Sequence, residues 1–220
     1  MEYEKLRTIV FTITTAMLFF IWGLLSDFIK SNLFWGISLS GIISLGTYRF
    51  ILKLAEMIMI KCKFIKKLVF GNKYLEGIWV GVYIAEDDNP RFYYECFEQD
   101  FSGLIIRGTC FNEDGTYKGS WISDNVYINE KTGTITYTYV TDMINNTGKN
   151  QGLAAFNFQR KSKKSITDKM IGFSSDIFSG KKIKSFEWKL NDKESPMGDS
   201  AIINVAKKYD QDNKSVITKN

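Results

Sequence analysis

Histidine is absent from this chain of 220 residues, and its absence removes several kinds of active site. Without an imidazole, the protein cannot hold a Ser-His-Asp triad, a Cys-His nucleophile pair or a histidine-based zinc site. The sequence also lacks an H-E-x-x-H motif, a P-loop and a Gly-rich dinucleotide fingerprint. Carboxylate or lysine chemistry stays possible. We nevertheless predict that the protein is not an enzyme and has no catalytic residues, no metal site and no cofactor.

Charged residues are missing from two long N-terminal runs, residues 8–26 and 31–48, which Asp27 and Lys30 separate. A helix needs roughly 20 largely apolar residues to cross the hydrocarbon core of a membrane. Gly and Ser recur in the second run, and small residues favour close helix packing in lipid. We therefore predict a transmembrane helical hairpin over residues 1–52, with its turn at the polar break. A buried soluble hairpin and a cleaved signal peptide are the alternatives.

The net charge of +5 is confined to the segment after the second run. Residues 49–67 hold six Lys or Arg residues against Glu56, whereas the remainder is neutral. This predicts a basic juxtamembrane helix over 53–70 that contacts anionic membrane lipids, and no DNA or RNA polymer as a partner. Because basic segments stay cytoplasmic, we expect a multi-pass inner-membrane protein with both termini in the cytoplasm.

Cysteine is scarce: Cys62, Cys96 and Cys110 form an odd set without a C-x-x-C pair. Structural disulfides are rare in the cytoplasm, where the previous argument puts the rest of the chain. We expect three free thiols that are buried as small apolar residues.

Beyond residue 70 the hydrophobic period changes from that of a helix to that of a strand. Runs with alternating polarity, separated mostly by Gly, Asn and Asp turns, predict eight strands: 76–85, 92–99, 103–111, 117–128, 134–142, 153–160, 169–178 and 184–190. The fold class is therefore membrane-anchored all-β, with an eight-stranded antiparallel lipocalin-like β-barrel over 71–195. A two-sheet sandwich is the alternative. In the tail, 196–220, we expect a short amphipathic stretch over 201–209 and disorder after Asp210.

The first predicted strand has an unusual pattern of glycine and aromatic residues. Gly77, Trp79, Gly81 and Tyr83 share one face by alternation, which predicts that Trp79 lies across the base of the barrel. As a bare pattern, such residues are involved in core packing more often than in ligand contacts.

A hairpin, a basic segment and a barrel that opens on "YLEGIWVGVY" resemble a group of bacterial CBASS effectors. These effectors are described as SMODS-associating, two-transmembrane and β-strand-rich. The resemblance covers essentially the whole chain through its architecture. It implies an effector of anti-phage defence whose barrel binds a cyclic oligonucleotide made by a partner nucleotidyltransferase. Protomers would assemble into homo-oligomers, and their helices would disrupt the inner membrane and stop the infected cell.

A cyclic dinucleotide offers two bases that stack on rings and two phosphates that favour arginine. If Trp79 marks the inward face, Tyr83 lies on it too, and we predict Tyr83, Arg107, Trp121 and Tyr139 as ligand-binding residues. Arg107 is a lone cation in the apolar run "LIIRGTCF", and a pairing with Glu95 or Glu98 is its alternative.

Three further expectations concern the barrel interior. We expect one ring of the pair Tyr137 and Tyr139 to point inward, Arg91 to be solvated, and no acidic pair to share one face. Two other functions stay open: a membrane-tethered carrier or sensor of a small apolar ligand, whose interior would be apolar throughout, and an enzyme with carboxylate catalysis.

Overall fold

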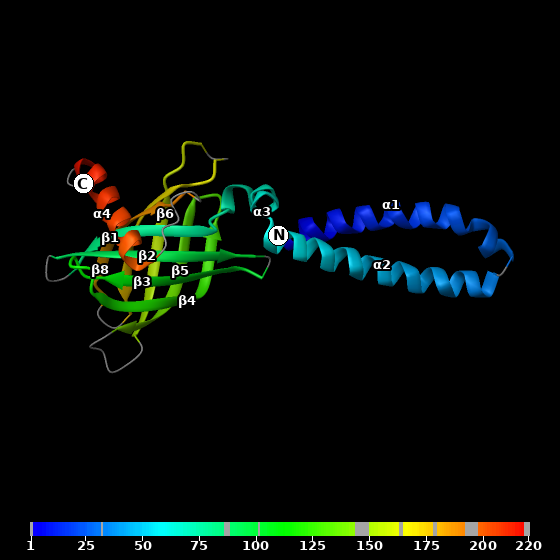
Figure 1. Ribbon diagram of the computed structural model, residues 1–220, viewed down its shortest axis with the longest axis horizontal. Coiled ribbons are helices and arrows are strands. Elements are labelled where there is room, and N and C mark those ends of the chain that lie inside the picture. The colour runs from blue at the N-terminus through cyan, green and yellow to red at the C-terminus, as the bar shows by residue number, and fades with distance from the viewer. Residues whose placement is uncertain are drawn as a thin grey trace. The chain divides into compact units, whose positions relative to one another are not determined.

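The computed structural model describes residues 2–31, 33–85, 89–100, 102–143, 150–162, 165–177, 180–191 and 198–217. It divides the chain into two compact units, Met1–Phe70 and Gly71–Asn220. The first unit is helical, and the second contains the sheet and a C-terminal helix (Figure 1).

The helical unit consists of α1 (Glu2–Ser31), α2 (Leu33–Lys61) and α3 (Lys63–Phe70). In Figure 1, α1 and α2 run side by side in opposite directions. The predicted pair of helices is confirmed, but the turn does not lie at Asp27 and Lys30, because α1 continues through both residues to Ser31 and α2 begins at Leu33. No Gly or Pro occurs between Asp27 and Lys30, so the backbone hydrogen bonding of a helix can continue through this polar segment.

The end of the helical unit agrees with the sequence. Helix α3 stops at Phe70, and Gly71 follows with a φ of 55°, a left-handed conformation that glycine adopts without strain. A short 3-10 turn, Gly71–Lys73, then leads toward the sheet.

Over the residues that the structure describes, hydropathy identifies no helix that is both long and apolar enough to span a membrane. The spans expected within residues 1–52 are therefore not confirmed.

The described part of the second unit contains eight antiparallel strands: β1 (Gly77–Ile84), β2 (Pro90–Gln99), β3 (Leu104–Phe111), β4 (Tyr117–Asn129), β5 (Thr134–Met143), β6 (Asn150–Phe158), β7 (Lys169–Asp176) and β8 (Lys182–Lys189). Each strand pairs with the next along the chain, and β1 also pairs with β8 (Figure 1). The sheet is thus a closed barrel. This confirms the predicted eight-stranded barrel and excludes the sandwich.

The base of the barrel is filled by apolar side chains around Trp79, which is fully buried. The Trp79 ring packs on Phe97 with a centroid distance of 5.4 Å, and its Nε1 donates to the carbonyl oxygen of Leu75 at 2.9 Å. Gln99 accepts a hydrogen bond from the Leu75 amide at 2.9 Å. These contacts hold the residues that precede β1 in place. Apolar side chains fill this end of the barrel.

Helix α4 (Asp199–Ile217) covers the outer face of the barrel at β1 and β2. Ile202, Ile203 and Ala206 are buried in one cluster with Val80 and Val82, which point away from the interior. Strand β1 is therefore apolar on both faces, because one faces the barrel interior and the other faces α4.

The expected disorder after Asp210 is wrong, because α4 continues to Ile217. At its middle, Tyr209 stacks on Trp188 with a centroid distance of 5.9 Å. The three cysteines are free, as expected, but Cys62 and Cys96 are only partly buried, and Cys110 is the buried one of the three.

Truncating a side chain of α4 that faces the barrel tests this packing. We expect Ile203→Ala to lower the free energy of unfolding by roughly 2–4 kcal/mol, because it removes buried apolar contacts and leaves a cavity. Urea denaturation followed by tryptophan fluorescence measures the change. Asn204→Ala, an exposed neighbour on the same helix, is the control and should have little effect. Equal stability of the two variants would contradict the observed packing of α4.

Candidate functional site

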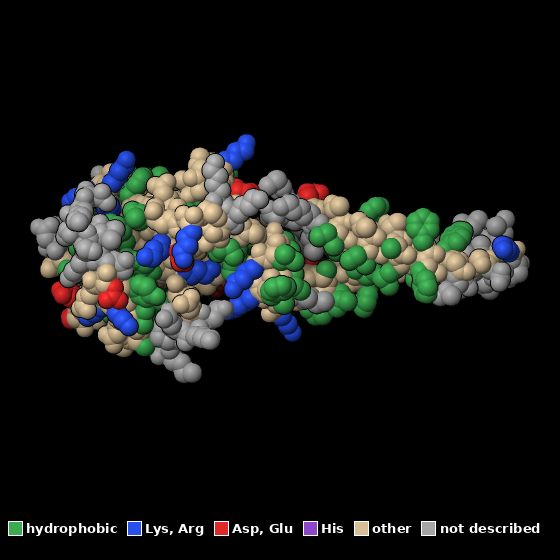
Figure 2. Space-filling view, turned by 90° about the horizontal axis from the view of Figure 1, so that it is seen from above, with side chains coloured by type: hydrophobic (Ala, Val, Ile, Leu, Met, Phe, Trp, Pro, Cys, Tyr) green, Lys and Arg blue, Asp and Glu red, His purple; other side chains and the backbone are tan. Residues whose placement is uncertain are grey.

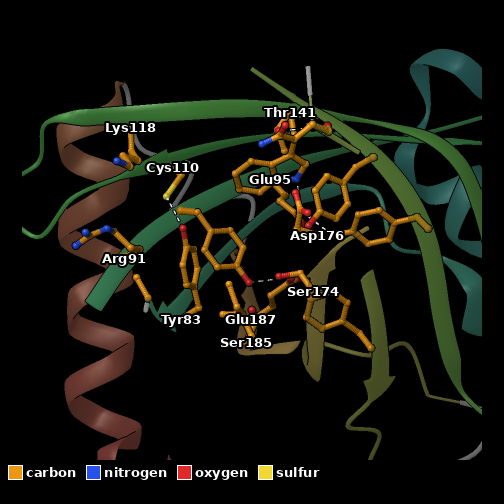
Figure 3. A pocket seen from close by; sticks show the side chains of 18 of the residues that line it. Tyr83, Arg91, Glu95, Cys110, Lys118, Thr141, Ser174, Asp176, Ser185 and Glu187 are labelled. Carbon is orange, nitrogen blue, oxygen red and sulfur yellow. Dashed lines mark hydrogen bonds between the residues drawn. The ribbon is translucent and has the colours of Figure 1, made fainter. Parts of the chain in front are cut away.

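The interior of the barrel holds a cavity of about 680 Å³, to which each of the eight strands contributes side chains. This volume lies within the range of roughly 300–1,000 Å³ typical of small-molecule sites. The cavity begins where the apolar filling around Trp79 stops. Its lining is mixed, with aromatic, acidic and basic side chains (Figure 3).

Aromatic rings of the cavity wall lie on glycines of neighbouring strands. Tyr93 faces Gly81, Trp121 faces Gly108 and Tyr139 faces Gly152, each as a directly paired residue in the sheet. A Cβ at any of these glycines would overlap the facing ring. The missing side chains therefore let the rings lie along the wall, which leaves space in the centre of the barrel and presents ring surfaces to it.

Two glutamates are buried in this cavity, and each is 1% exposed. Glu95 accepts hydrogen bonds at Oε1 from the Tyr137 hydroxyl and from Trp121 Nε1, both at 2.8 Å. Glu187 accepts one at Oε1 from the Tyr93 hydroxyl at 2.9 Å. Among the described residues, the Oε2 atoms of both glutamates have no hydrogen-bond partner. Each carboxyl group is thus held through one oxygen and leaves the other unsatisfied.

Gly81 makes one of these contacts possible. It pairs with Tyr93 of β2 on one side and with Glu187 of β8 on the other. Because Gly81 has no side chain, the Tyr93 ring lies across β1 and its hydroxyl reaches Glu187.

The environment of both carboxyl groups favours their protonated forms. Burial raises the pKa of Glu95 to about 7, although the hydrogen bonds from Tyr137 and Trp121 act in the opposite direction. Burial and the neighbouring Glu95 together raise the pKa of Glu187 well above its usual range, against a single hydrogen bond from Tyr93. Burial also raises the pKa of Tyr93 and of Tyr137, so both hydroxyls stay protonated and remain donors.

Basic side chains line another part of the cavity. Arg91, Lys118 and Lys181 bring positive charge to it, and all three are more exposed than the glutamates. Figure 3 shows Arg91 and Lys118 on the same side of the cavity as Tyr83 and Cys110. The Tyr83 hydroxyl and Cys110 Sγ are 3.4 Å apart in a hydrogen bond. The cavity therefore combines a buried acidic part with a more exposed basic part.

The structure brings together three of the four predicted ligand-binding residues. Tyr83, Trp121 and Tyr139 all line the cavity, and Trp79 lies beneath it in the apolar filling. The inward orientation predicted for Arg107 is wrong. Glu95 pairs with Gly108, so alternation turns Arg107 to the outside, where it is half-exposed and its Nη1 lies 2.6 Å from Glu98 Oε1.

Three further expectations about the interior also fail. Tyr137 and Tyr139 both line the cavity, because residues two positions apart in a strand share a face. Arg91 lines the cavity instead of being fully solvated. Glu95 and Glu187 form the acidic pair that was not expected. Glu95 alternates with Tyr93 and Phe97 in "FYYECFEQ", which is the one local signal of its inward position.

Comparisons of this chain with protein families, with curated proteins and with solved structures found no match. The resemblance to CBASS effectors thus stays a prediction from the sequence, and no family is assigned.

Titration of the buried carboxyl groups generates a prediction about pH. The pKa of Glu95 rises from 4.5 to about 7 on folding, so the folded state binds more protons between these values. The stability that this group contributes is complete below pH 4.5 and is lost as the pH rises through 7. Glu187 acts in the same direction. We expect Glu95→Gln to reduce this loss by up to roughly 3 kcal/mol.

Urea denaturation at pH 5 and at pH 8 measures the effect. The difference in the free energy of unfolding between Glu95→Gln and the wild type should favour the variant more at pH 8 than at pH 5. Glu98→Gln, three residues along β2 and exposed on the outside, is the matched control and should follow the wild type. If the free energy of unfolding depends on pH in the same way for Glu95→Gln and Glu98→Gln, burial does not raise the pKa of Glu95.

Proposed function

We propose that the barrel binds a cyclic dinucleotide in its cavity and that the protein acts as a CBASS-type effector. The observation that carries this proposal is the composition of one cavity: ring surfaces, positive charge and unsatisfied acceptors occur together in a volume suited to a small molecule. A nucleotide has one chemical group for each of these features, namely a base plane, a phosphate and donor groups on the edge of the base.

The rings of Tyr83, Trp121 and Tyr139 suit base stacking, which is worth about 1–3 kcal/mol per base. Arg91, Lys118 and Lys181 suit phosphate oxygens through charge-assisted hydrogen bonds. The phosphates therefore face the more exposed side of the cavity, and a base extends toward the buried glutamates. Arg107 has no part in this arrangement because it lies on the outside of the barrel.

A carrier of an apolar ligand is less well supported. Such a protein needs an interior lined by apolar groups, whereas this cavity contains two buried glutamates and several cations. An apolar ligand would leave the Oε2 atoms of both glutamates buried without a partner, which is costly.

The carboxyl pair supports a second candidate, acid–base catalysis on the bound molecule. Perturbed carboxyl groups in a cavity are typical of general acids and bases. Glu95, whose pKa is about 7, has the property that such a role needs. The two candidates differ in outcome: a sensor releases its ligand intact, and an enzyme converts it.

The helical unit supports a role at the membrane. Large apolar side chains are exposed along α1 and α2, among them Phe19 at 76% and Leu45 at 71%. Figure 2 shows such side chains distributed over the surface of the helix pair. Exposed apolar surface of this extent suits lipid or other copies of the protein better than water. We propose that the pair inserts in the inner membrane with both termini in the cytoplasm, and that ligand-driven homo-oligomers disrupt the bilayer.

In this proposal a partner nucleotidyltransferase makes the cyclic oligonucleotide during phage infection. Binding in the barrel then leads to growth arrest or death of the infected cell. In this proposal the protein senses the nucleotide and does not convert it.

Binding is tested on the full-length protein in a mild detergent. We expect at least one cyclic dinucleotide to raise the melting temperature, because a ligand that binds only the folded state stabilises it. Arg91→Ala should weaken binding by roughly 1.5–3 kcal/mol, the worth of a hydrogen bond to a charged group. Arg107→Ala removes the same side chain from the outside of the barrel and should bind normally.

The same assay includes spermidine and a fatty acid, and chromatography shows whether the nucleotide is recovered intact. A shift with spermidine or the fatty acid alone would contradict the proposed ligand class. Conversion of the nucleotide would favour the enzyme.

Membrane attachment is tested by fractionation. We expect the full chain to stay with the membranes after an alkaline carbonate wash, because its apolar helices are held by lipid, and a chain that begins at Gly71 to be released. A reporter fused after Asn220 should be active in the cytoplasm. Periplasmic activity would reverse the topology, and release of the full chain by carbonate would remove the membrane step.

A further inference from the structure

We propose that Glu95 and Glu187 select a nucleobase that carries an exocyclic amino group, through hydrogen bonds to their two unpartnered oxygens. This inference rests on the proposed function, because it names the class of base that the same cavity accepts. Adenine, guanine and cytosine carry such a group, whereas uracil and hypoxanthine do not.

The first argument is the way in which the two carboxyl groups are held. The donors from Tyr93, Trp121 and Tyr137 all reach Oε1 atoms, so these bonds orient the carboxyl groups without using Oε2. Both Oε2 atoms are buried and have no partner among the described residues. Buried polar atoms are nearly always satisfied in proteins, and exceptions indicate a function or a bound molecule. The two oxygens are thus candidate contacts for a ligand.

The second argument is the chemistry that the two oxygens can accept. An exocyclic amino group has two N–H donors on one nitrogen, and guanine adds the neighbouring ring N–H. These donors match two acceptors in one cavity. The corresponding edges of uracil and hypoxanthine have a single N–H beside carbonyl oxygens or bare ring nitrogens. Such a base would leave one acceptor unsatisfied, and a site built for hydrogen bonding rejects an analogue that lacks the group.

The third argument is the position of the rings. Trp121 lines the cavity and also donates to Glu95, so the indole that offers a stacking surface touches the carboxyl group that would contact the edge of the base. Tyr93 has the same relation to Glu187. A base stacked on these rings is therefore held with its edge near the acceptors.

Protonation gives the proposal a second readout. Burial raises the pKa of both carboxyl groups, so protons are bound to them near neutral pH before a ligand enters. Donors from an amino group stabilise the ionised forms and displace protons. Binding of an amino-bearing base at pH 7 should therefore release protons. These appear as a binding enthalpy that depends on the ionisation enthalpy of the buffer.

The experiment is calorimetric titration of the full-length protein in detergent with five probes: cyclic di-AMP, di-GMP, di-CMP, di-UMP and di-IMP. We expect at least one of the first three to bind about tenfold or more tightly than di-UMP and di-IMP, as the loss of a hydrogen bond to a charged acceptor implies. Glu95→Gln and Glu187→Gln should each reduce this ratio and the proton release. Glu98→Gln should change neither, because Glu98 lies outside the barrel.

The outcomes separate the inference from the function on which it rests. Equal affinity for amino-bearing and amino-lacking probes would overturn the inference and leave nucleotide binding in place. The inference would also be overturned if both glutamine variants kept the preference for amino-bearing probes. If none of the five probes binds, nucleotide binding in the barrel is itself overturned. The comparison of probes on the wild-type protein does not depend on any variant. A glutamine variant that still binds cyclic di-IMP is folded.

Discussion

The pairing of β1 with β8 is the constraint on which the rest of the barrel depends. It closes the sheet and places β8, with Glu187, on one side of β1. Strand β2, with Tyr93 and Glu95, lies on the other side of β1. Without this closure Glu187 would lie on the edge strand at one end of an open sheet, and Glu95 on the second strand from the other end. The acidic part of the cavity is therefore a product of topology, because no short segment of the chain contains it.

The strands were predictable because their signals are local. Alternating polarity and turns rich in Gly, Asn and Asp located all eight, and the helix predicted to end at residue 70 ends there in the structure. The polar break in the N-terminal segment was misread because Asp27 and Lys30 lower hydrophobicity without interrupting helical hydrogen bonding. A helix boundary needs a residue that changes the backbone, and Gly71 is such a residue whereas Asp27 is not.

The site was only partly predictable, since it depends on which face of each strand points inward. In β3 the face with Arg107 also contains Ile105 and Phe111, so hydrophobicity does not distinguish inside from outside. Phe111 is buried on the outer face because it belongs to the cluster under α4. The prediction for Arg107 relied on a difference in hydrophobicity between the two faces of β3. Helix α4 lies far away in the sequence, and the apolar cluster beneath it makes the outer face hydrophobic as well. The rings were found more readily, because Tyr83 and Trp79 share one strand and one face.

The pairs of glycine and aromatic residues in the cavity wall have a consequence for the history of this protein. At Gly81, Gly108 and Gly152 any larger residue would overlap the facing ring, yet their backbones need no special conformation. Glycine is thus required because of the aromatic ring on the paired strand, and it is no longer required when a small side chain replaces that ring. In related sequences, each of these positions should be free to vary where Tyr93, Trp121 or Tyr139, respectively, has been replaced, and should stay glycine elsewhere. Covariation between a glycine and a ring on the next strand would then record the shape of the cavity in sequence alone.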